Sequence, residues 1–319
     1  MDILVVGSVA LDTVQTPFGQ IQEALGGSAT HFSVAASFFI APHLVAVVGE
    51  DFPEEHLDFL RSKKVCLNGL QKKEGKTFRW KGKYSYDLNQ AETLDTQLNV
   101  FQNFYPELPT EYRKKEIVFL ANIDPELQSR VIDQCIDPKL IAMDTMNFWI
   151  HGKKDSLLKT LKRVDLLLIN ESEARDLAGE PNLVKAAKKI REWGPKTVAI
   201  KRGEYGALLF HQNQVFSAPA LPLEDINDPT GAGDSFAGGF LGYLAQSENF
   251  SFDSLKKASI YGSVLASFNV EEFSCDRLRR LTEKEIEDRY FEFCKLAHFE
   301  VIPLSPWRRE GRGKGGTSN

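Results

Sequence analysis

"NDPTGAGDSFAGGF", residues 227 to 240, passes from a glycine-rich segment into a run of small and apolar residues, with one acid, Asp234, between the two. Gly231 and Gly233 permit backbone conformations that are closed to other residues, so backbone N–H groups can be exposed there. From about Ala232 onward the composition predicts a helix, and the dipole and unpaired donors at its amino terminus favour an anion. The stretch therefore predicts an anion hole followed by an acid in the first helical turn.

Two hypotheses account for Asp234. An acid in the first turn stabilises the helix dipole by about 0.3 to 1 kcal/mol, which is a structural role. That role alone does not require two preceding glycines or the small residues that follow. In the second hypothesis Asp234 is a general base that takes the proton of a substrate hydroxyl, while the N–H groups hold a γ-phosphoryl group as charge develops on it.

Short apolar runs recur along the chain and end in Gly, Asp, Asn or Lys, as expected for strands that are buried on both faces of a parallel sheet. These runs are "DILVVG", "LVAVVG", "EIVFLA", "LIAMD", "DLLLIN" and "TVAIK". Helix-like segments lie between them, for example "DPELQSRVIDQC" with an Asp cap and a proline in its first turn. Strand and helix in alternation predict a doubly wound α/β fold with helices on both faces of the sheet.

Two segments interrupt the alternation. Residues 9 to 20 and 77 to 88 carry β-branched and aromatic residues around Pro-Phe-Gly and Lys-Gly-Lys, which predict antiparallel strands joined by turns. They can form a small sheet that acts as a lid, and two surface hairpins without a role are the alternative. The predicted division is an α/β core of residues 1–8, 28–68 and 101–306, a β lid of residues 9–27 and 69–100, and a disordered tail of residues 307–319.

Composition excludes several classes of function. The 319 residues carry a formal net charge of −5, and they show no strong basic face of the kind that would indicate a nucleic-acid partner. The four cysteines lack metal-site spacing and do not suggest a disulfide framework. The apolar amino terminus is short and carries Asp2 where a signal peptide would carry a basic residue. We therefore expect a cytoplasmic protein without a membrane partner.

The stretch "DPTGAGDSFAGGFL" resembles the carboxy-terminal signature of the PfkB, or ribokinase-like, family of carbohydrate and nucleoside kinases. "GGSATHFSVAASFF" is similar to the family's Gly-Gly segment, "NESE" to its N-x-x-E motif, and "KRGEYGALLF" to its next strand and glycine turn. The resemblance covers nearly all of residues 1 to 300. It implies a Rossmann-like, mostly parallel sheet with a β lid, ATP and Mg²⁺ as cofactors, and phosphorylation of a hydroxyl group.

The resemblance also implies roles for individual residues. Asp234 matches the catalytic base and Gly231, Ala232 and Gly233 match the anion hole; Asn170 and Glu173 match the pair that organises Mg²⁺ through waters; Lys201 and Gly203 match nucleotide contacts; and Asp228 and Thr230 match positions that hold a monovalent cation such as K⁺ in some members. Structural alternatives stay open at several of these positions. Glu173 can be a first-turn helix acid, Lys201 a solvated lysine, and Asp228 a turn former.

The acceptor site is predicted at the amino-terminal end of the chain. Asp12 follows the first strand, where family members often bind substrate hydroxyls, and Gly26 and Gly27 let the backbone approach a sugar closely. His31 stands where ribokinases usually have an amide, a departure that argues against ribose, and a structural role is its alternative. Asn122 is a further candidate contact because it follows a predicted strand.

Asn147 also follows a predicted strand, and either asparagine can instead be a turn former. Arg79 and Trp80 can close over a substrate or pack in a lid-to-lid homodimer.

The predicted activity is an ATP-dependent kinase acting on a small sugar or polyol. A nucleoside kinase of the same family is the first alternative, because the fold does not determine which alcohol binds. A non-catalytic sugar-binding or regulatory protein is the second.

Overall fold

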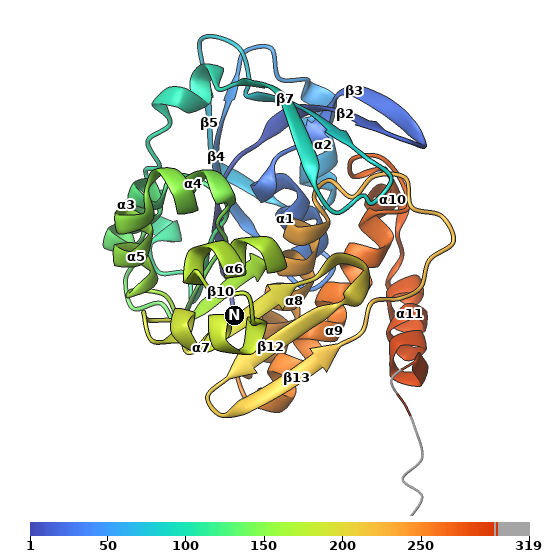
Figure 1. Cartoon of the computed structure of the whole chain (residues 1–319). Coiled ribbons are helices and arrows are strands. Elements are labelled where there is room, and N and C mark those ends of the chain that lie inside the picture. Colours follow the sequence, from blue (N-terminus) through green and yellow to red (C-terminus); the bar gives the residue numbers. More distant parts are fainter. Residues whose placement is uncertain (297, 299–319) are drawn as a thin grey trace, which may run out of the picture.

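The structure, a computed structural model, describes residues 1–296 and residue 298, so the predicted tail at 307–319 lies outside the described residues. Its centre is a nine-stranded sheet in the order β13-β12-β11-β10-β9-β8-β1-β4-β5 (Figure 1). The strands are β1 (Ile3–Val6), β4 (His43–Gly49), β5 (Cys66–Lys73), β8 (Ile117–Leu120), β9 (Leu140–Met143), β10 (Leu166–Asn170), β11 (Thr197–Lys201), β12 (Ala207–His211) and β13 (Gln214–Ala218).

Helices cover both faces of this sheet (Figure 1). One face is covered by α1 (Ser28–Ala36), α2 (Glu54–Ser62), α8 (Ala232–Ser247), α9 (Phe252–Asn269), α10 (Asp276–Arg280) and α11 (Glu283–Leu296). The other is covered by α3 (Pro125–Gln134), α4 (Asn147–Gly152), α5 (Lys154–Leu161), α6 (Glu171–Ala178) and α7 (Leu183–Arg191). Three short 3₁₀ turns complete the described helices: η1 (Asn99–Asn103), η2 (Thr110–Tyr112) and η3 (Gly203–Tyr205).

Strand β1 shows why the predicted runs are apolar throughout. Ile3 and Val5 belong to the hydrophobic cluster on one face of the sheet, whereas Leu4 and Val6 belong to the cluster on the other. Successive side chains point to opposite faces, so a strand with helices on both sides needs apolar residues at every position. The predicted apolar runs form β1, β4, β8, β9, β10 and β11, which pair in parallel. The predicted doubly wound α/β fold is confirmed.

A second, four-stranded sheet has the order β3-β2-β6-β7 and is called the lid sheet below. It lies at the top of Figure 1 and consists of β2 (Ala10–Thr16), β3 (Gly19–Gly26), β6 (Arg79–Tyr84) and β7 (Ala91–Gln97). The turn predicted at Pro-Phe-Gly is confirmed, because it joins the antiparallel strands β2 and β3. The turn predicted at Lys-Gly-Lys is wrong. That segment lies inside β6. The ring of Trp80 packs against Gly82, and a side chain at position 82 would overlap this ring.

The antiparallel arrangement predicted for the lid strands is confirmed for β2 with β3 and for β6 with β7. The two antiparallel pairs join in parallel, β2 against β6, which the long stretch of core sequence between these strands permits. The lid boundary expected at residue 69 is wrong, since residues 69 to 73 pair with β4 in the large sheet. The second lid segment therefore begins near Arg79.

Helix α8 packs closely against α1 and α9. A side chain at Gly238 would overlap the Phe32 carbonyl of α1, and one at Gly239 would lie 2.7 Å from the Tyr261 carbonyl of α9. The small residues of "DSFAGGF" thus let α8 run between two neighbours, and this packing fixes the position of its amino terminus. None of the helices within residues 1–296 has the length and apolar character needed to cross a membrane.

Candidate active site

Three polar side chains meet at one edge of the large sheet. Asp144 directly follows β9, Asn170 ends β10 and Lys201 ends β11, and these strands are parallel neighbours. Their carboxyl ends therefore open on the same crevice, which is where α/β folds bind ligands. The Lys201 ammonium donates to the Asp144 carboxylate with an Nζ–Oδ2 distance of 2.7 Å, and both side chains are largely buried.

Asp144 was not among the residues predicted from the sequence. The signal that could have found it is the acid that directly follows the apolar run "LIAM". A buried glutamine, Gln128 of α3, fixes this end of β9, because its side-chain amide donates to the backbone carbonyls of Leu120, Ala121 and Asp144. The carboxylate that pairs with Lys201 is thus held by its own strand and by α3.

The amino terminus of α8 faces the same group of charges. Asp234 lies in the first turn of α8, and a side chain at Gly233 would come within 3.0 Å of the Lys201 Nζ atom. The ammonium therefore lies directly against the predicted anion hole. Removal of the Asp234 carboxyl from water, together with the negative charge of Asp144, raises its pKa to about 8, and the charge of Lys201 opposes this shift.

Gly231 caps α8 in a conformation that few other residues adopt. Its φ is 75°, and a side chain there would overlap the ring of His31. His31 is only 2% exposed, and its Nδ1 atom lies 3.1 Å from the Asn269 Oδ1 atom. Burial lowers the pKa of His31 to about 4, so the ring is neutral near pH 7. The structure thus places His31 beneath the glycine turn, and its predicted substrate contact stays a prediction.

Asn170 and Glu173 form a capping box at the start of α6. The Asn170 side chain accepts from the Glu173 backbone N–H at 2.8 Å, and the Glu173 carboxylate accepts from the Asn170 N–H at 2.9 Å. Burial and the nearby charge of Asp144 raise the pKa of Glu173. The structural role weighed for Glu173 is therefore present, and the Mg²⁺-organising role of the pair stays a prediction.

Gly203 begins η3, just beyond Lys201, with a φ of 54°. A side chain at Gly203 would overlap the amide of Asn89, which belongs to the loop between β6 and β7 of the lid sheet. The lid sheet therefore reaches the predicted nucleotide loop, which the sequence did not indicate.

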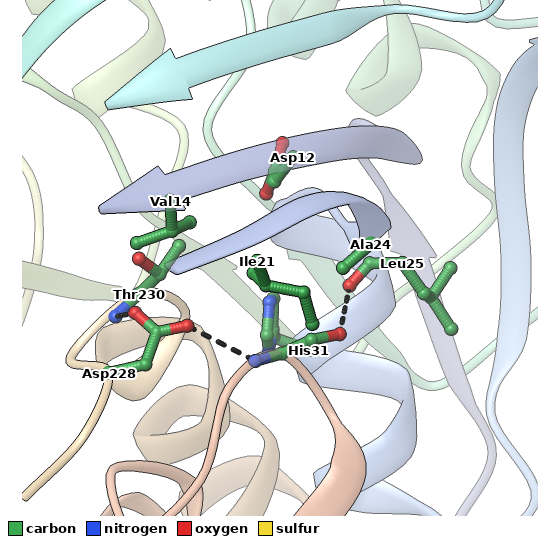
Figure 2. A pocket seen from close by; sticks show the side chains of 9 residues that line it. Asp12, Val14, Ile21, Ala24, Leu25, His31, Asp228 and Thr230 are labelled. Carbon is green, nitrogen blue, oxygen red and sulfur yellow. Dashed lines mark hydrogen bonds between the residues drawn. The ribbon is translucent and has the colours of Figure 1, made fainter. Parts of the chain in front are cut away.

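Asp12 lies on β2 of the lid sheet and lines a narrow crevice above His31, Asp228 and Thr230 (Figure 2). Gly26 lies opposite, where any side chain would overlap the Asp12 carboxylate. The Asp12 carboxylate accepts from the Gly27 N–H at 3.3 Å, and burial raises its pKa to about 7 against the effect of this bond. Asp12, Gly26 and Gly27 are thus brought together as predicted, although their contact with an acceptor stays a prediction.

Asp228 and Thr230 hold the loop that precedes α8. Asp228 accepts from the backbone N–H groups of Thr230 and Ser274, at 2.9 and 3.1 Å, and burial raises its pKa (Figure 2). The turn-forming role considered for Asp228 is therefore present, and the monovalent-cation site is untested. The Thr230 hydroxyl lies 3.3 Å from the Tyr84 hydroxyl at the end of β6. Tyr84 was also missed from the sequence.

The remaining candidates make local contacts. The Asn122 amide accepts from the Trp149 indole at 3.0 Å and donates to the Met146 sulfur at 3.1 Å, so its substrate contact stays a prediction. Asn147 begins α4. Arg79 binds Glu23 and Asp51, each at 2.8 Å, and thereby ties the lid sheet to the core. Trp80 donates its indole N–H to Thr93 within the lid sheet. Neither observation tests a lid-to-lid homodimer.

Within residues 1–296 no three His, Cys, Asp or Glu groups converge to hold a metal ion. Mg²⁺ is commonly bound by one or two carboxylates together with waters and substrate phosphates, so such a cage is not required. Three carboxyl groups, those of Asp144, Glu173 and Asp234, interact with a single ammonium, that of Lys201, and oxygen donors in excess over cations suit a phosphate-bound Mg²⁺. The donor set therefore fits Mg²⁺ carried by a nucleotide.

Sequence comparisons relate the chain to known kinases. Residues 2–279 match the model of the pfkB family carbohydrate kinases. A cytidine kinase of Thermococcus kodakarensis is 33% identical over 247 residues, which cover 76% of this chain and 87% of that protein. A nucleoside kinase of Methanothermobacter thermautotrophicus is 25% identical over 296 residues, covering 85% of this chain and 90% of that protein.

Solved structures show the same fold. The nucleoside kinase of Burkholderia thailandensis, solved with inosine, aligns with a TM-score of 0.74 over 91% of this chain and 97% of that one, at 16% identity. The ribokinase of Thermotoga maritima aligns with a TM-score of 0.73 over 92% of this chain and 99% of that one, at 20% identity. Because a nucleoside kinase and a sugar kinase fit almost equally well, the fold does not distinguish the acceptors.

Proposed function

Because the chain belongs to the pfkB family of carbohydrate kinases, we propose that this phosphotransferase moves the γ-phosphoryl group of ATP to a hydroxyl of a nucleoside. The observation that carries the choice of acceptor is the 33% identity to a cytidine kinase over 76% of this chain. The sequence had placed a sugar or polyol first and a nucleoside second. The relatives named cytidine kinase and nucleoside kinase support the opposite order.

In the proposed reaction the acceptor oxygen bonds to the γ-phosphorus, its proton passes to Asp234, and the bond from the γ-phosphorus to ADP breaks. Asp234 suits the role of base because its raised pKa, about 8, lies close to the working range of a general base near neutral pH. The backbone N–H groups of Gly231, Gly233 and Asp234 and the Lys201 ammonium would provide positive charge on the side where the phosphoryl oxygens gain negative charge, whereas the Ala232 N–H donates to the Pro229 carbonyl at 3.2 Å.

Mg²⁺ bound to ATP would supply further positive charge to the phosphates, with Asn170 and Glu173 as its protein contacts through water. Asp12, held by Gly27 and lining the crevice of Figure 2, would orient the acceptor by accepting from one of its hydroxyls. Gly26 gives the Asp12 carboxylate the space it occupies. Asp228 and Thr230 would shape the loop that precedes α8, with K⁺ as a candidate ligand there.

The test is phosphorylation of defined acceptors by MgATP, with and without K⁺. Cytidine, uridine, adenosine and inosine are compared with ribose, fructose and myo-inositol, and the phosphorylated product is identified by mass spectrometry. We expect product from at least one nucleoside and a lower kcat/KM for every sugar. Turnover of sugars or polyols alone would restore the first acceptor class, and no turnover of any compound would revive a non-catalytic role.

A pair of variants tests the base. Asp234→Asn removes the proposed base, whereas Asp253→Asn removes the first-turn acid of α9, which is exposed and outside the site. Loss of turnover in the first variant but not in the second assigns a role beyond helix stabilisation to Asp234. Equal, small effects would leave only the dipole role.

A further inference from the structure

A cluster of buried polar side chains lies directly beneath the anion hole. It consists of His31 of α1, Ser235 of α8 and Asn269, the last residue of α9, and none of the three is more than 2% exposed. Buried polar groups are costly unless they are hydrogen-bonded, so the arrangement of their bonds is informative. The chemical steps described above use none of these side chains.

The hydrogen bonds of Asn269 have only one consistent direction. Its amide nitrogen lies 2.7 Å from the backbone carbonyl of Thr230, and because a carbonyl can only accept, this contact fixes the orientation of the amide. The Asn269 oxygen then accepts from the Ser235 hydroxyl at 2.9 Å and from His31 Nδ1 at 3.1 Å. His31 therefore carries its proton on Nδ1, and α1, α8 and α9 are joined at one atom.

The same cluster determines where the glycine turn lies. Thr230, whose carbonyl is held by Asn269, directly precedes Gly231, whose φ is 75°. The His31 ring fills the space that a side chain on Gly231 would need. Asn269 thus binds the turn from below while His31 supports it, so the two side chains set both the position and the tilt of the peptide groups at residues 231 to 233.

We propose that Asn269 and His31 are positioning residues for phosphoryl transfer, which hold the anion-hole N–H groups at the height where they meet the transferring phosphoryl group. The inference rests on the proposed function, because it needs the turn at residues 231 to 234 to be an anion hole. It gives His31 a role different from the substrate contact expected from the sequence. Preorganised donors act on the transition state more than on bound substrate, so their displacement should lower kcat more than it raises KM.

Asn269→Asp is the most direct test. A carboxylate still accepts from Ser235 and His31, but it cannot donate to the Thr230 carbonyl and it repels that oxygen. We expect kcat to fall by about tenfold or more, below the loss of roughly 10²-fold or more seen when an oxyanion donor itself is removed. KM for ATP and for the nucleoside should change by less than about twofold, since ground-state binding is retained. Asn213→Asp, in the exposed turn between β12 and β13, is the matched control and should behave as wild type.

A binding measurement reports on the anion hole without turnover. MgADP with fluoroaluminate imitates the transferring phosphoryl group, so its affinity for Asn269→Asp should fall by about the same factor as kcat, because transition-state analogues report transition-state binding. The affinity for MgADP alone should be unchanged. A variant that retains the wild-type kcat and the wild-type fluoroaluminate affinity overturns the inference.

Substitutions of His31 test the inference even if Asn269→Asp does not fold. His31→Gln keeps a donor for the Asn269 oxygen, whereas His31→Leu has none. At matched thermal stability, Gln should retain several times the kcat of Leu, and equal kcat values would contradict a positioning role. A purely structural cluster would lower the melting temperature while kcat and both KM values stayed at wild-type levels, and this result would also overturn the inference.

Failure of the proposed function has a different signature. If Asp234→Asn retained turnover as well as the Asn269 and His31 variants, the proposed function itself would be wrong. The turn at residues 231 to 234 would then not be a catalytic anion hole, and there would be nothing for Asn269 and His31 to position. If Asp234→Asn lost turnover and the Asn269 and His31 variants did not, the proposed function would stand and only the positioning role would fail.

Discussion

The candidate site has a core half, at the carboxyl ends of β9, β10 and β11 and the amino terminus of α8, and a lid half, at β2 and β3. Each half contains a carboxylate with a raised pKa, but the surroundings of the two carboxylates differ. Asp234 in the core interacts with Lys201, whose ammonium lies against the neighbouring Gly233. Asp12 in the lid sheet has a backbone N–H of Gly27 as its partner, and no ion pair to it occurs within residues 1–296. The negative charge of another acid, Asp228, raises the pKa of Asp12 further.

This difference suggests a division of labour. A carboxylate next to an ammonium and a helix amino terminus lies where negative charge moves during phosphoryl transfer. A carboxylate that is dehydrated and lacks a cation is suited to accept hydrogen bonds from neutral hydroxyl groups. We therefore expect substitutions in the core half to change turnover and nucleotide binding, and substitutions in the lid half to change acceptor binding and coupling.

The largest effect is expected from Asp234→Asn. Loss of a general base should lower kcat by about 10²- to 10⁴-fold, with the affinity for ATP nearly unchanged. Steady-state kinetics together with ATP binding by calorimetry measure both quantities. Loss of a general base costs at least about 10²-fold in turnover. Turnover within about threefold of wild type would therefore show that Asp234 is not the base, and the proposed difference between the two halves would fail.

Lys201→Met should affect both stability and nucleotide use. Asp144 is only 4% exposed, and the substitution would leave its carboxylate without a cation. A buried charge that loses its partner typically lowers the free energy of unfolding by about 3 to 5 kcal/mol. The loss of a charged contact to phosphate should lower kcat/KM for ATP by roughly 10- to 150-fold. Urea unfolding and kinetics measure the two effects.

A double variant separates these two consequences. Lys201→Met with Asp144→Asn removes both charges and should regain most of the stability but not the nucleotide use. Lys196→Met, at an exposed lysine outside the site, is the matched control. Full recovery of kcat/KM for ATP in the double variant would show that Lys201 acts only by holding Asp144.

Asp12→Ala should raise KM for the acceptor by about tenfold or more, as expected when a hydrogen bond to a charged group is lost, while KM for ATP changes little. Initial rates with each substrate varied in turn measure the effect. Equal changes in both KM values would remove Asp12 from the acceptor site and abolish the proposed difference between the two halves.

The core half was largely predictable from the sequence because its signals are local. The apolar runs that end in polar residues indicate parallel strands, and "DPTGAGDSFAGGF" contains both the turn and the helix that follows it. Asp144 was not predicted as a site residue, because a single acid after a strand is ambiguous until the strand order shows that Lys201 lies nearby. The contact of His31 with Asn269 spans 238 residues, and no local pattern indicates it.

The lid half was less predictable because its order depends on pairing between distant segments. Lys81, Gly82 and Lys83 have the composition of a turn, yet they are held in β6 by β2 on one side and β7 on the other. With β6 extended, Tyr84 reaches Thr230, a contact between residues 146 apart in sequence. The sequence therefore predicted a small second sheet but not which of its residues contact the core.

The pH dependence should also follow the core carboxylate. The proposed base, Asp234, can accept a proton only when it is deprotonated, so kcat/KM for the acceptor should fall about tenfold per pH unit below a pKa near 8. Asp234→Asn should remove this limb from its residual activity. A profile that is flat between pH 6 and 8 in the wild type would contradict the shift.

The same shift has a consequence for stability. The folded protein holds the Asp234 proton more tightly than the unfolded chain, whose carboxyl has a pKa of 3.8, so this group costs stability progressively as pH rises from about 4 to about 8. The melting temperature of Asp234→Asn relative to wild type should therefore increase across that window and level off above it. A difference that is constant with pH would show that the carboxyl has an ordinary pKa.

The smallest effect is expected from Tyr84→Phe, which joins the two halves. The Tyr84 hydroxyl of the lid sheet lies 3.3 Å from the Thr230 hydroxyl, one residue before the proposed anion hole. If closure of the lid and formation of the anion hole are linked through this contact, its loss should let water compete with the acceptor. We expect the fraction of ATP hydrolysed without transfer to rise about 2- to 10-fold, since a single neutral hydrogen bond contributes about 0.5 to 1.5 kcal/mol.

The ratio of ADP formed to nucleoside phosphorylated measures this loss of coupling, and it does so independently of changes in kcat. Tyr86→Phe, at a side chain that is 85% exposed in the loop after β6, removes a hydroxyl without touching Thr230 and should keep the wild-type ratio. Thr230→Val removes the partner hydroxyl, so it should reproduce the Tyr84→Phe ratio, and the two substitutions together should add nothing further. Additive effects would mean that the two hydroxyls act separately and that the lid contributes only acceptor contacts.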